Sequence, residues 1–425
     1  MKFTEFALPA VVLRGIAEAG FERLTPVQEE SIPLALSAKD VAAQAQTGTG
    51  KTAAFLISLF TRLLAAGQET TNNPRALIMA PTRELVVQIC ADADLLGKYT
   101  GLRVQAIFGG MDYDKQRQAL KDGVDIIVAT PGRLIDYFRQ KVFSLRRVEM
   151  LVIDEADRMF DMGFIKDLRY ILRQLPPFEK RQTMLFSATL SPQVMELAYE
   201  FMNIAEKVSI EPKQMTAIKI DQILYHVSRR EKFALLLGLL KSETDIERML
   251  LFVNTKIEGE RLHALLEANG FSAGVLSGDV VQKKRMRILE RFKLGEIQCL
   301  VATDVASRGI HVDNITHVVN YDLPQDREDY VHRIGRTARA GASGRAISFA
   351  DEETVYQLAE IEEYLGHAIP STMPIDADFC FEYKRVARKK RPPLVERKKE
   401  AGNPASRPRP RRRPAGRKPA APRAE

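Results

Sequence analysis

Short apolar runs alternate along the chain with longer segments in which apolar residues recur at helical spacing. Short apolar runs bounded by turn signals are typical of buried strands, and a period near 3.6 is typical of amphipathic helices. In the first half, the pattern predicts helices such as 83–96 and 165–175 between strands over 76–80, 104–108, 125–129, 150–153 and 184–186. Strands that are apolar throughout, rather than at alternate positions, indicate a parallel sheet covered on both faces.

The same alternation returns in the second half and predicts a second domain of the same kind. Strands are expected over 249–253, 272–276, 297–302, 317–320 and 345–349, and helices over 259–269 and 283–292. Between the halves, residues 206–221 are more polar and less periodic, as is typical of a linker. We therefore predict an α/β fold with two tandem parallel-sheet domains, over 1–205 and 222–383.

The last part of the chain, 384–425, differs sharply in composition from the rest. It holds 17 Lys and Arg against 3 Asp and Glu, with eight Pro and no aromatic residue. Such a segment buries too little apolar surface to offset the entropy cost of folding, which predicts a disordered basic tail. The remaining 1–383 holds 46 basic and 52 acidic residues, so the net charge of +8 comes entirely from the tail.

The cysteines and the apolar stretches exclude several classes of protein. Cys90, Cys299 and Cys380 lie far apart and lack the spacing of metal ligands, so neither a disulfide framework nor a structural zinc site is expected. The first residues lack the basic start and apolar run of a signal peptide. The densest apolar stretch, near 233–240, is far shorter than the roughly 20 residues that span a bilayer. A cytoplasmic protein without a membrane segment is predicted.

A small-residue loop between an apolar stretch and the helical pattern of 53–64 predicts a phosphate site. Its spacing fits a Walker A loop, in which backbone N–H groups and a helix N-terminus face phosphate oxygens. Lys51 is expected to reach the β- and γ-phosphates, and Thr52 to hold Mg²⁺. The alternative is a Gly-rich turn that binds nothing. The predicted nucleotide-binding residues of the loop are Ala45, Gln46, Thr47, Gly48, Thr49, Gly50, Lys51 and Thr52.

Carboxylates follow directly after the predicted strand 150–153, in the order Asp154-Glu155-Ala156-Asp157. Open α/β sheets bind ligands beyond the carboxyl ends of their strands. Asp154 is therefore expected to organise Mg²⁺, and Glu155 to polarise the water that attacks the nucleotide. The alternative is a set of acidic residues that only complements a helix N-terminus.

The quartet at 154–157 spells the motif of the DEAD-box RNA helicases, and the rest of the chain resembles that family in order over about 1–370. The resemblance implies two RecA-like domains and an ATP-dependent RNA helicase. Besides 154–157, the matching segments are Gly20-Phe21 with Thr25-Pro26-Val27-Gln28, 81–85, Gly109-Gly110, 130–133, 187–189, 251–255, Gln282 with Arg285, 302–309 and 332–339.

The resemblance also implies roles for residues around the nucleotide. Gln28 is expected to read the adenine edge with its amide, and Phe21 or Phe3 to pack near the base, although either fits a core position equally well. Arg336 and Arg339 are expected to act as arginine fingers from the second domain, the alternative being surface charge or RNA contact. Asp304 is expected to contact the ribose.

RNA is expected to bind across both domains, opposite the nucleotide, through hydroxyls, glycine N–H groups and guanidinium groups that suit phosphate oxygens. Little in this set reads base edges, so binding should be nearly independent of sequence, with 2′-hydroxyl contacts favouring RNA over DNA. ATP and RNA would each favour the closed arrangement and so be coupled. The predicted RNA-binding residues are Thr82, Arg83, Gly110, Thr130, Arg133, Arg285, Thr303 and Gly309.

Within the family, the chain most resembles the bacterial RhlB helicases, in stretches such as 75–85, 132–137, 154–167 and 282–289. That resemblance implies a monomer, a role in RNA degradation and a possible partner in the endoribonuclease of an RNA-degrading assembly. The basic tail is interpreted as an RNA tether, with a solubility tail or a protein-docking segment as alternatives. Alternative functions are an ATP-gated RNA clamp, a DNA motor and a helicase of ribosome assembly.

Overall fold

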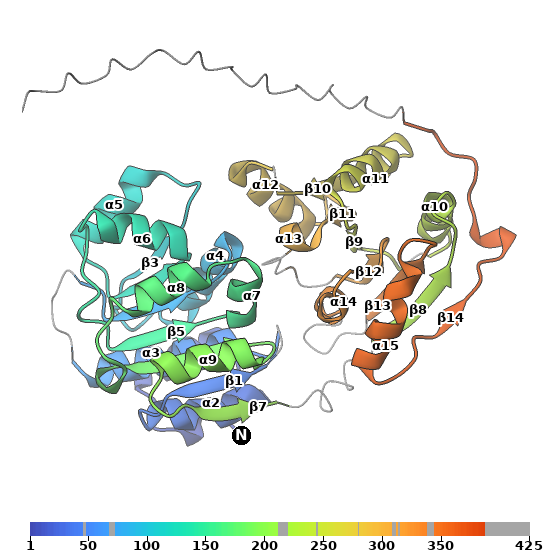
Figure 1. Cartoon of the computed structure of the whole chain (residues 1–425). Helices are drawn as coiled ribbons and strands as arrows, with labels where there is room; N and C mark the ends of the chain where they lie inside the picture. Colours follow the sequence, from blue (N-terminus) through green and yellow to red (C-terminus); the bar gives the residue numbers. More distant parts are fainter. Residues whose placement is uncertain are drawn as a thin grey trace, which may run out of the picture. The chain divides into compact units, whose positions relative to one another are not determined.

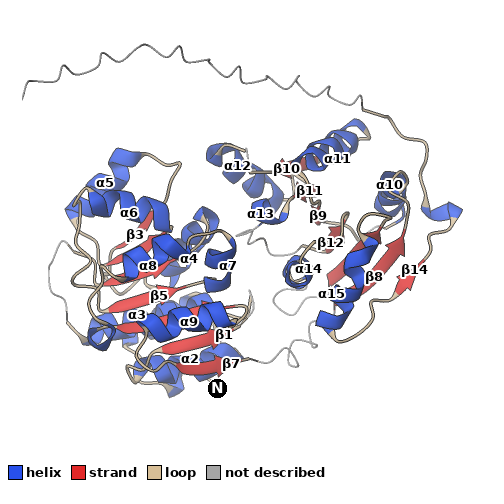
Figure 2. Cartoon of the chain, viewed as in Figure 1, coloured by secondary structure: helices blue, strands red, loops and turns tan. Residues whose placement is uncertain are grey.

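The computed structural model describes residues 1–45, 48–67, 73–210, 220–243, 245–278, 280–307, 312, 315–337 and 344–386. They form two parallel sheets flanked by helices, one before residue 210 and one after residue 220 (Figures 1 and 2). This arrangement confirms the predicted α/β fold class of two tandem domains. The part of the predicted tail from 387 onward lies outside the described residues. No helix within these ranges is long and apolar enough to cross a membrane.

The first sheet orders its described strands β3-β4-β2-β5-β6-β1-β7, and each pair is parallel. The strands are β1 (Val41–Gln44), β2 (Ala76–Met79), β3 (Val104–Ile107), β4 (Ile126–Ala129), β5 (Met150–Ile153), β6 (Gln182–Ser187) and β7 (Glu206–Ser209). The helices are α1 (Ala10–Glu18), α2 (Pro26–Leu36), α3 (Lys51–Ala65), α4 (Arg83–Leu96), α5 (Tyr113–Asp122), α6 (Pro131–Arg139), α7 (Ala156–Asp161), α8 (Ile165–Leu172) and α9 (Pro192–Phe201), with 3₁₀ turns η1 (Phe3–Glu5) and η2 (Phe178–Lys180).

The second sheet orders its described strands β10-β11-β9-β12-β13-β8-β14, again with parallel pairs. The strands are β8 (Ile220–His226), β9 (Met249–Phe252), β10 (Ala273–Leu276), β11 (Cys299–Ala302), β12 (His317–Asn320), β13 (Gly344–Ala350) and β14 (Ser371–Thr372). The helices are α10 (Lys232–Ser242), α11 (Lys256–Ala268), α12 (Gln282–Lys293), α13 (Asp304–Ser307), α14 (Arg327–Ile334) and α15 (Leu358–Leu365), with 3₁₀ turns η5 (Val355–Gln357) and η6 (Asp376–Asp378).

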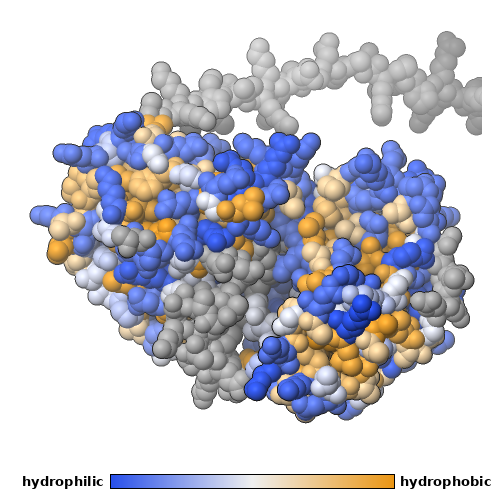
Figure 3. All heavy atoms as spheres, turned by 180° about the vertical axis from the view of Figure 1, so that it is seen from behind, coloured by the Kyte–Doolittle hydropathy of each residue, from blue (hydrophilic) through white to orange (hydrophobic). Residues whose placement is uncertain are grey.

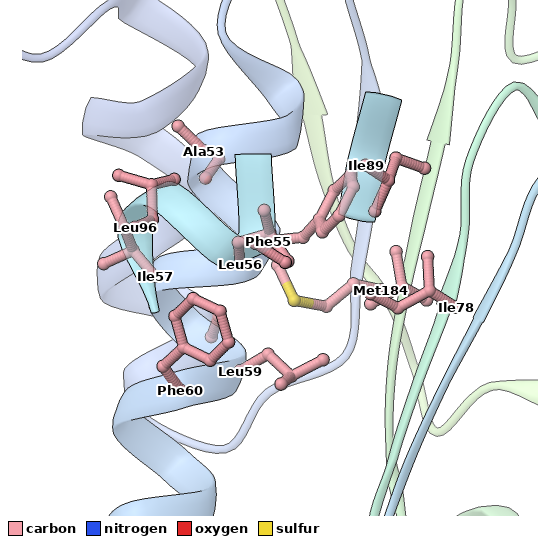
Figure 4. Close-up of a cluster of buried hydrophobic side chains, with 14 of the residues drawn as sticks. Ala53, Phe55, Leu56, Ile57, Leu59, Phe60, Ile78, Ile89, Leu96 and Met184 are labelled. Atoms are coloured by element: carbon pink, nitrogen blue, oxygen red, sulfur yellow. The ribbon is translucent and has the colours of Figure 1, made fainter. Parts of the chain in front are cut away.

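Both faces of the central strands β2, β4, β5 and β6 of the first sheet are buried, as their continuous apolar runs predicted. Along β2, Ala76 and Ile78 join one hydrophobic cluster, while Leu77 and Met79 join the other. This alternation follows from the two-residue period of a strand. Figure 4 shows Phe55 and its neighbours from α3 packed near Ile78 and Met184. This packing fixes the position of α3, which begins at Lys51, against the sheet.

Hydrophobic residues also reach the surface, and Figure 3 shows them gathered in patches between hydrophilic areas on one face. Tyr199 on α9 and Tyr356 on η5 are further large side chains that are largely exposed. Exposed apolar surface is normal in folded proteins and needs no special function.

The predicted linker over 206–221 is too long at both ends. β7 pairs with β1 of the first sheet, and β8 pairs with β13 of the second. β7 is an edge strand in which three of the four residues are exposed, so its sequence lacks the apolar run that marks a buried strand. The structure therefore assigns 206–209 to the first domain.

A buried lysine joins three elements of the second domain. Lys232, at the start of α10, is 1% exposed, and its Nζ lies 2.6 Å from Asp351 Oδ2 and 3.0 Å from Asp322 Oδ1. Asp322 Oδ2 in turn accepts a hydrogen bond from the backbone N–H of Asn254 at 3.0 Å. Because a buried charge needs a partner, the lysine and the two carboxylates depend on each other.

Replacing Lys232 by Met is expected to lower the free energy of unfolding of the second domain by about 3–5 kcal/mol, because two carboxylates lose their cation. Chemical denaturation measures this loss. Lys241→Met, at the exposed end of the same helix, is the control and should change stability little. A loss no larger than that of the control would contradict the role of the triad.

The same triad predicts a dependence on pH. Burial raises the pKa of Asp351, but hydrogen bonds from Lys232 and Thr354 outweigh burial and hold that pKa below its usual value. A carboxyl group with a lowered pKa stabilises the fold above its unfolded pKa, and this stabilisation is lost as the pH falls through its folded pKa. The difference in free energy of unfolding between the unchanged protein and Lys232→Met should therefore become smaller below about pH 4.

Candidate active site

The loop after β1 leads directly into α3, whose N-cap residue is Gly50. Gly48 and Gly50 have φ of 87° and 91°, in the left-handed region that favours glycine. A Cβ atom on Gly50 would lie 2.5 Å from Nε2 of Gln28, so the loop and α2 approach closely there. The N-terminal N–H groups of α3 and the side chain of Lys51 thus meet at one place, which suits an anion. The predicted residues Gln46 and Thr47 lie outside the described residues.

A pocket of about 390 Å³ opens beside this loop in the first domain. Most of the predicted nucleotide-binding residues that the structure describes reach it, including Lys51, Thr52 and both carboxylates that follow β5. The pocket also has lining residues for which the sequence predicted no role. These are Arg23, Ala53, Leu85, Gln88, Asp92, Leu95 and Leu96, besides Thr25 of the matched segment.

The amide of Gln28 braces the phosphate loop from α2. Its Nε2 donates to the carbonyl of Gly50 at 3.0 Å, and its Oε1 accepts from the N–H of Thr25 at 2.9 Å. Nε2 keeps a second proton and Oε1 a second lone pair, so the amide of Gln28 can still form hydrogen bonds with the edge of a base. Phe21 is 42% exposed and lines the same pocket, so the core position that the sequence left open for it is excluded.

The carboxylates after β5 lie at the same edge of the sheet as the phosphate loop, because β1, β6 and β5 are neighbouring parallel strands. Asp154 and Glu155 are 2% and 4% exposed. Glu155 has φ of 50°, a conformation that is rare for a residue with a side chain and that occurs often at functional sites. The backbone N–H of Glu155 donates to Oδ1 of Asp154 at 2.9 Å, which fixes the first carboxylate.

Burial raises the pKa of Asp154 to about 6, although the nearby Lys51 lowers it. Burial destabilises the charged form of this carboxylate, and a further cation in the pocket would stabilise it. The hydroxyl of Thr52 and the carboxylate of Asp154 are oxygen ligands of the kind that Mg²⁺ prefers. The residues present therefore fit the predicted metal.

Asp157, for which the sequence predicted no role of its own, connects this site to the loop after β6. Its Oδ2 accepts hydrogen bonds from the backbone N–H groups of Ala188 and Thr189 at 3.0 and 3.2 Å. Its own N–H donates to Oγ of Ser187 at 3.1 Å. Asp157 thus joins the segment after β5 to residues 187–189 through three hydrogen bonds.

A second unpredicted residue, Arg158, lies against the candidate general base. Its Nε is 3.7 Å from Oε2 of Glu155, and both side chains are almost fully buried. Arg158 also lines a small pocket with Asp304, His332 and Arg336 of the second domain. Arg336 is 3% exposed, and its Nε donates to the carbonyl of His332 at 3.2 Å. Arg339 lies outside the described residues.

Asp304 pairs with a buried arginine of its own domain. Both of its carboxylate oxygens accept from Arg333, at 2.6 Å each. Arg333 is 1% exposed and also donates to Asn254 Oδ1 and to the carbonyl of Asp322. We therefore interpret Asp304 as the residue that positions Arg333. Each of its oxygens keeps a second lone pair, and its contact with the ribose stays a prediction. The sequence showed Arg333 inside the segment 332–339, where only the two later arginines were given roles.

Five of the eight predicted RNA-binding residues line one further pocket, of about 490 Å³: Thr82, Arg83, Thr130, Arg133 and Arg285. Glu84, which the sequence did not predict, pairs there with Arg285 and accepts from Gln282 Nε2 at 3.0 Å. Gly110 lies next to this group, because a Cβ atom on it would come within 2.6 Å of Arg83. Thr303 does not line this pocket, and Gly309 lies outside the described residues.

Comparison with known proteins decides the family. The model "DEAD/DEAH box helicase" matches 25–197, and "Helicase conserved C-terminal domain" matches 231–341. Over 405 residues, the chain is 50% identical to the ATP-dependent RNA helicase RhlB of Shewanella frigidimarina, covering 95% of this chain and 93% of that one. The chain belongs to the DEAD-box helicase family. The helicase is also 51% identical to RhlB of Idiomarina loihiensis, with 97% and 96% covered.

Solved structures agree with this conclusion. The helicase matches S. cerevisiae Dbp5 bound to RNA and ADP BeF3 with a TM-score of 0.78 and 32% identity, covering 88% of this chain and 95% of that one. It matches Mss116p bound to ssRNA and AMP-PNP with the same TM-score and 31% identity, covering 88% and 78%. The helicase is therefore an ATP-hydrolysing enzyme of two RecA-like domains, an ATP-dependent RNA helicase of the DEAD-box type.

Proposed function

We propose that the helicase separates short RNA duplexes locally and couples this to RNA-stimulated hydrolysis of ATP. The observation that carries the proposal is the single pocket in which Lys51, Thr52, Asp154 and Glu155 meet beside the N-terminus of α3. These groups supply what phosphoryl transfer to water requires, namely charge around the phosphates and a base for the water. The similarity to Dbp5 and Mss116p, whose structures contain RNA and a nucleotide, supports the same reaction.

In this proposal each residue of the pocket has a separate task. Lys51 and the N–H groups of α3 hold the β- and γ-phosphates. Thr52 and Asp154 would hold Mg²⁺, which when bound adds positive charge against the phosphate oxygens. Glu155 accepts a proton from the attacking water, and the buried Arg158 beside it holds that carboxylate in place. Gln28 and Phe21 contact the base.

The second domain completes the site. Arg336 and Arg339 stabilise the negative charge that develops on the transferred phosphoryl group. The network of Arg333 with Asp304 and Asn254 fixes the start of this segment, so the fingers extend from a rigid base. ATP and RNA each contact both domains, so each favours the same arrangement and strengthens binding of the other.

RNA binds through the pocket that Thr82, Arg83, Thr130, Arg133 and Arg285 line, with Gly110, Thr303 and Gly309 completing the path. Thr82 Oγ1 also caps α4 by accepting from the N–H of Leu85, which leaves its hydroxyl proton for a phosphate oxygen. Because these groups suit phosphates and not base edges, we propose binding that is nearly independent of sequence.

The test is steady-state ATP hydrolysis with and without single-stranded RNA, together with unwinding of a short RNA duplex. Strong stimulation by RNA and ATP-dependent unwinding support the proposal. Stimulation without unwinding would favour an ATP-gated RNA clamp, the second candidate, which the same ATP site supports. Equal stimulation by DNA would contradict the preference for RNA.

The cellular role we propose is RNA degradation in the cytoplasm, by a monomer that associates with the endoribonuclease of an RNA-degrading assembly. The similarity over most of the chain to proteins named RhlB supports this role over ribosome assembly. Isolating the proteins that co-purify with the helicase tests it, since a ribonuclease and ribosomal particles are different outcomes.

Truncation after Val386 is expected to weaken RNA binding at least about tenfold at low salt while leaving kcat at saturating RNA unchanged. The removed segment is strongly basic, and its Lys and Arg side chains would neutralise RNA phosphates and release counterions. Without them, the RNA affinity should depend less steeply on the salt concentration. Fluorescence anisotropy at several salt concentrations measures both effects. This cut keeps the hydrogen bonds of Lys384 with Asn269. Unchanged RNA affinity would contradict the tether.

A further inference from the structure

Three side chains gather at the edge of the second sheet opposite the one that carries Asn254 and Asp304. Glu243 directly follows α10, Asp245 lies in the connection to β9, and His317 begins β12. One imidazole nitrogen and one oxygen of each carboxylate all lie within 4.8 Å of one another. The side chains of His317 and Glu243 are 2% and 12% exposed, and Asp245 is exposed. Neither ATP hydrolysis nor RNA binding uses these residues.

The hydroxyl of Thr316 holds the imidazole ring of His317 from one side. It lies 3.0 Å from Nδ1 of His317 and accepts from the N–H of Arg248 at 3.3 Å. When Nδ1 carries the proton of the neutral ring, Nε2 presents a lone pair.

That lone pair faces a carboxylate. Nε2 of His317 lies 3.0 Å from Oε2 of Glu243. Neither of these buried atoms forms a hydrogen bond with any residue that the structure describes, so Oε2 lies off the direction of a proton on Nε2. Two acceptors in van der Waals contact repel each other unless a cation lies between them. Two ligand atoms about 2.1 Å from one ion in tetrahedral coordination are about 3.4 Å apart, so a small movement of either side chain would admit the ion.

We propose that Glu243, Asp245 and His317 bind a divalent transition-metal ion of the Zn²⁺ class. An imidazole ligand disfavours Mg²⁺ and Ca²⁺, whereas Zn²⁺ accepts imidazole and carboxylate ligands together. Water completes the coordination on the exposed side of Asp245.

The surrounding residues orient the ligands as is usual around protein-bound metals. Thr316 fixes the ring of His317 from its other nitrogen. Nη1 of Arg345 lies 2.8 Å from Oε1 of Glu243 and so leaves Oε2 for the metal. Asp221 lies 3.6 Å from Nε of Arg345 and offsets part of its positive charge. The sequence gave no sign of this site, because His317 lies 72 residues after Asp245 and only the fold brings the two together.

The position of the site implies a structural task. The metal would fasten the C-terminal end of α10 to the start of β12, at the edge of the sheet remote from Asp304. Because metal binds the folded arrangement, it should stabilise the second domain in proportion to its concentration relative to the dissociation constant. ATP hydrolysis should not respond to it.

The test is isothermal titration of the full chain with Zn²⁺, in excess Mg²⁺ and ADP so that the nucleotide site is already filled. We expect one Zn²⁺ per chain at this site and a raised melting temperature. Asp245→Asn, an exposed substitution, should weaken binding at least about tenfold, and His317→Asn should abolish it. The matched control is His263→Asn, since His263 lies 3.6 Å from Glu267 on α11 and belongs to no cluster of three ligands among the described residues. It should leave binding unchanged.

Two results would overturn the proposal. One is Zn²⁺ binding that Asp245→Asn and His317→Asn leave as it is. The other is no binding at all, with NMR titration showing His317 as a doubly protonated partner of Glu243, in which case a proton is the cation between them. Because Asp245→Asn lies at the surface, its folding can be checked by its ATPase activity, which separates loss of metal from loss of structure.

Discussion

Glu155→Gln is expected to reduce kcat for ATP hydrolysis by about 10²–10⁴-fold, which is the usual contribution of a positioned general base. The amide keeps the size of the side chain, and the left-handed backbone at 155 is unaffected by the change. It removes the charge and basicity that activate water. Since Lys51, Thr52 and the N–H groups of α3 are unchanged, the affinity for ATP should stay within a few-fold of its original value.

The measurement is steady-state ATPase activity with saturating RNA, with nucleotide affinity determined separately. Glu196→Gln is the control, because Glu196 is exposed on α9 of the same domain, where it pairs with Arg169. It should leave kcat unchanged. If Glu155→Gln lost its affinity for ATP along with kcat, the carboxylate would be needed for binding, and its role as the base would be wrong.

The sequence predicted the fold well where strands are buried on both faces. The apolar runs at 150–153 and 317–320 coincide with β5 and β12. Prediction failed at the sheet edges. β7 exposes most of its residues and β14 has only two, so neither carries an apolar pattern, although both add to a sheet through backbone hydrogen bonds.

The site could be predicted where residues lie close together in sequence and follow one strand, as Lys51 with Thr52 and Asp154 with Glu155 do. Contacts between residues far apart in the sequence could not be predicted. Nothing in the sequence indicates that Asp304 pairs with Arg333, because this ion pair depends on how α13 and α14 pack together. The orientation of Asp157 toward the N–H groups of 188 and 189 is likewise a property of the fold.

The arginines of the second domain carry the other large expected effect. Arg336→Lys should reduce kcat by about 10³-fold or more, within the range that arginine fingers contribute. Lysine keeps the charge but lacks the planar fork of donors that can hold two oxygens of the transferred phosphoryl group at once. The contact of Arg336 with the phosphoryl group forms only when nucleotide is bound. The affinity for RNA in the absence of nucleotide should therefore be unchanged.

The control for Arg336→Lys is Arg327→Lys on the same segment of chain, since Arg327 begins α14 and stacks on the ring of Tyr364. It should retain nearly full kcat. Single-turnover hydrolysis separates the chemical step from product release, and the loss should appear in the chemical step. Because Arg333 is left in place in both variants, its bonds to Asp304 and Asn254 keep the second domain folded. Equal losses in the two variants would mean that both arginines contribute alike, and would contradict the role of Arg336 as a finger.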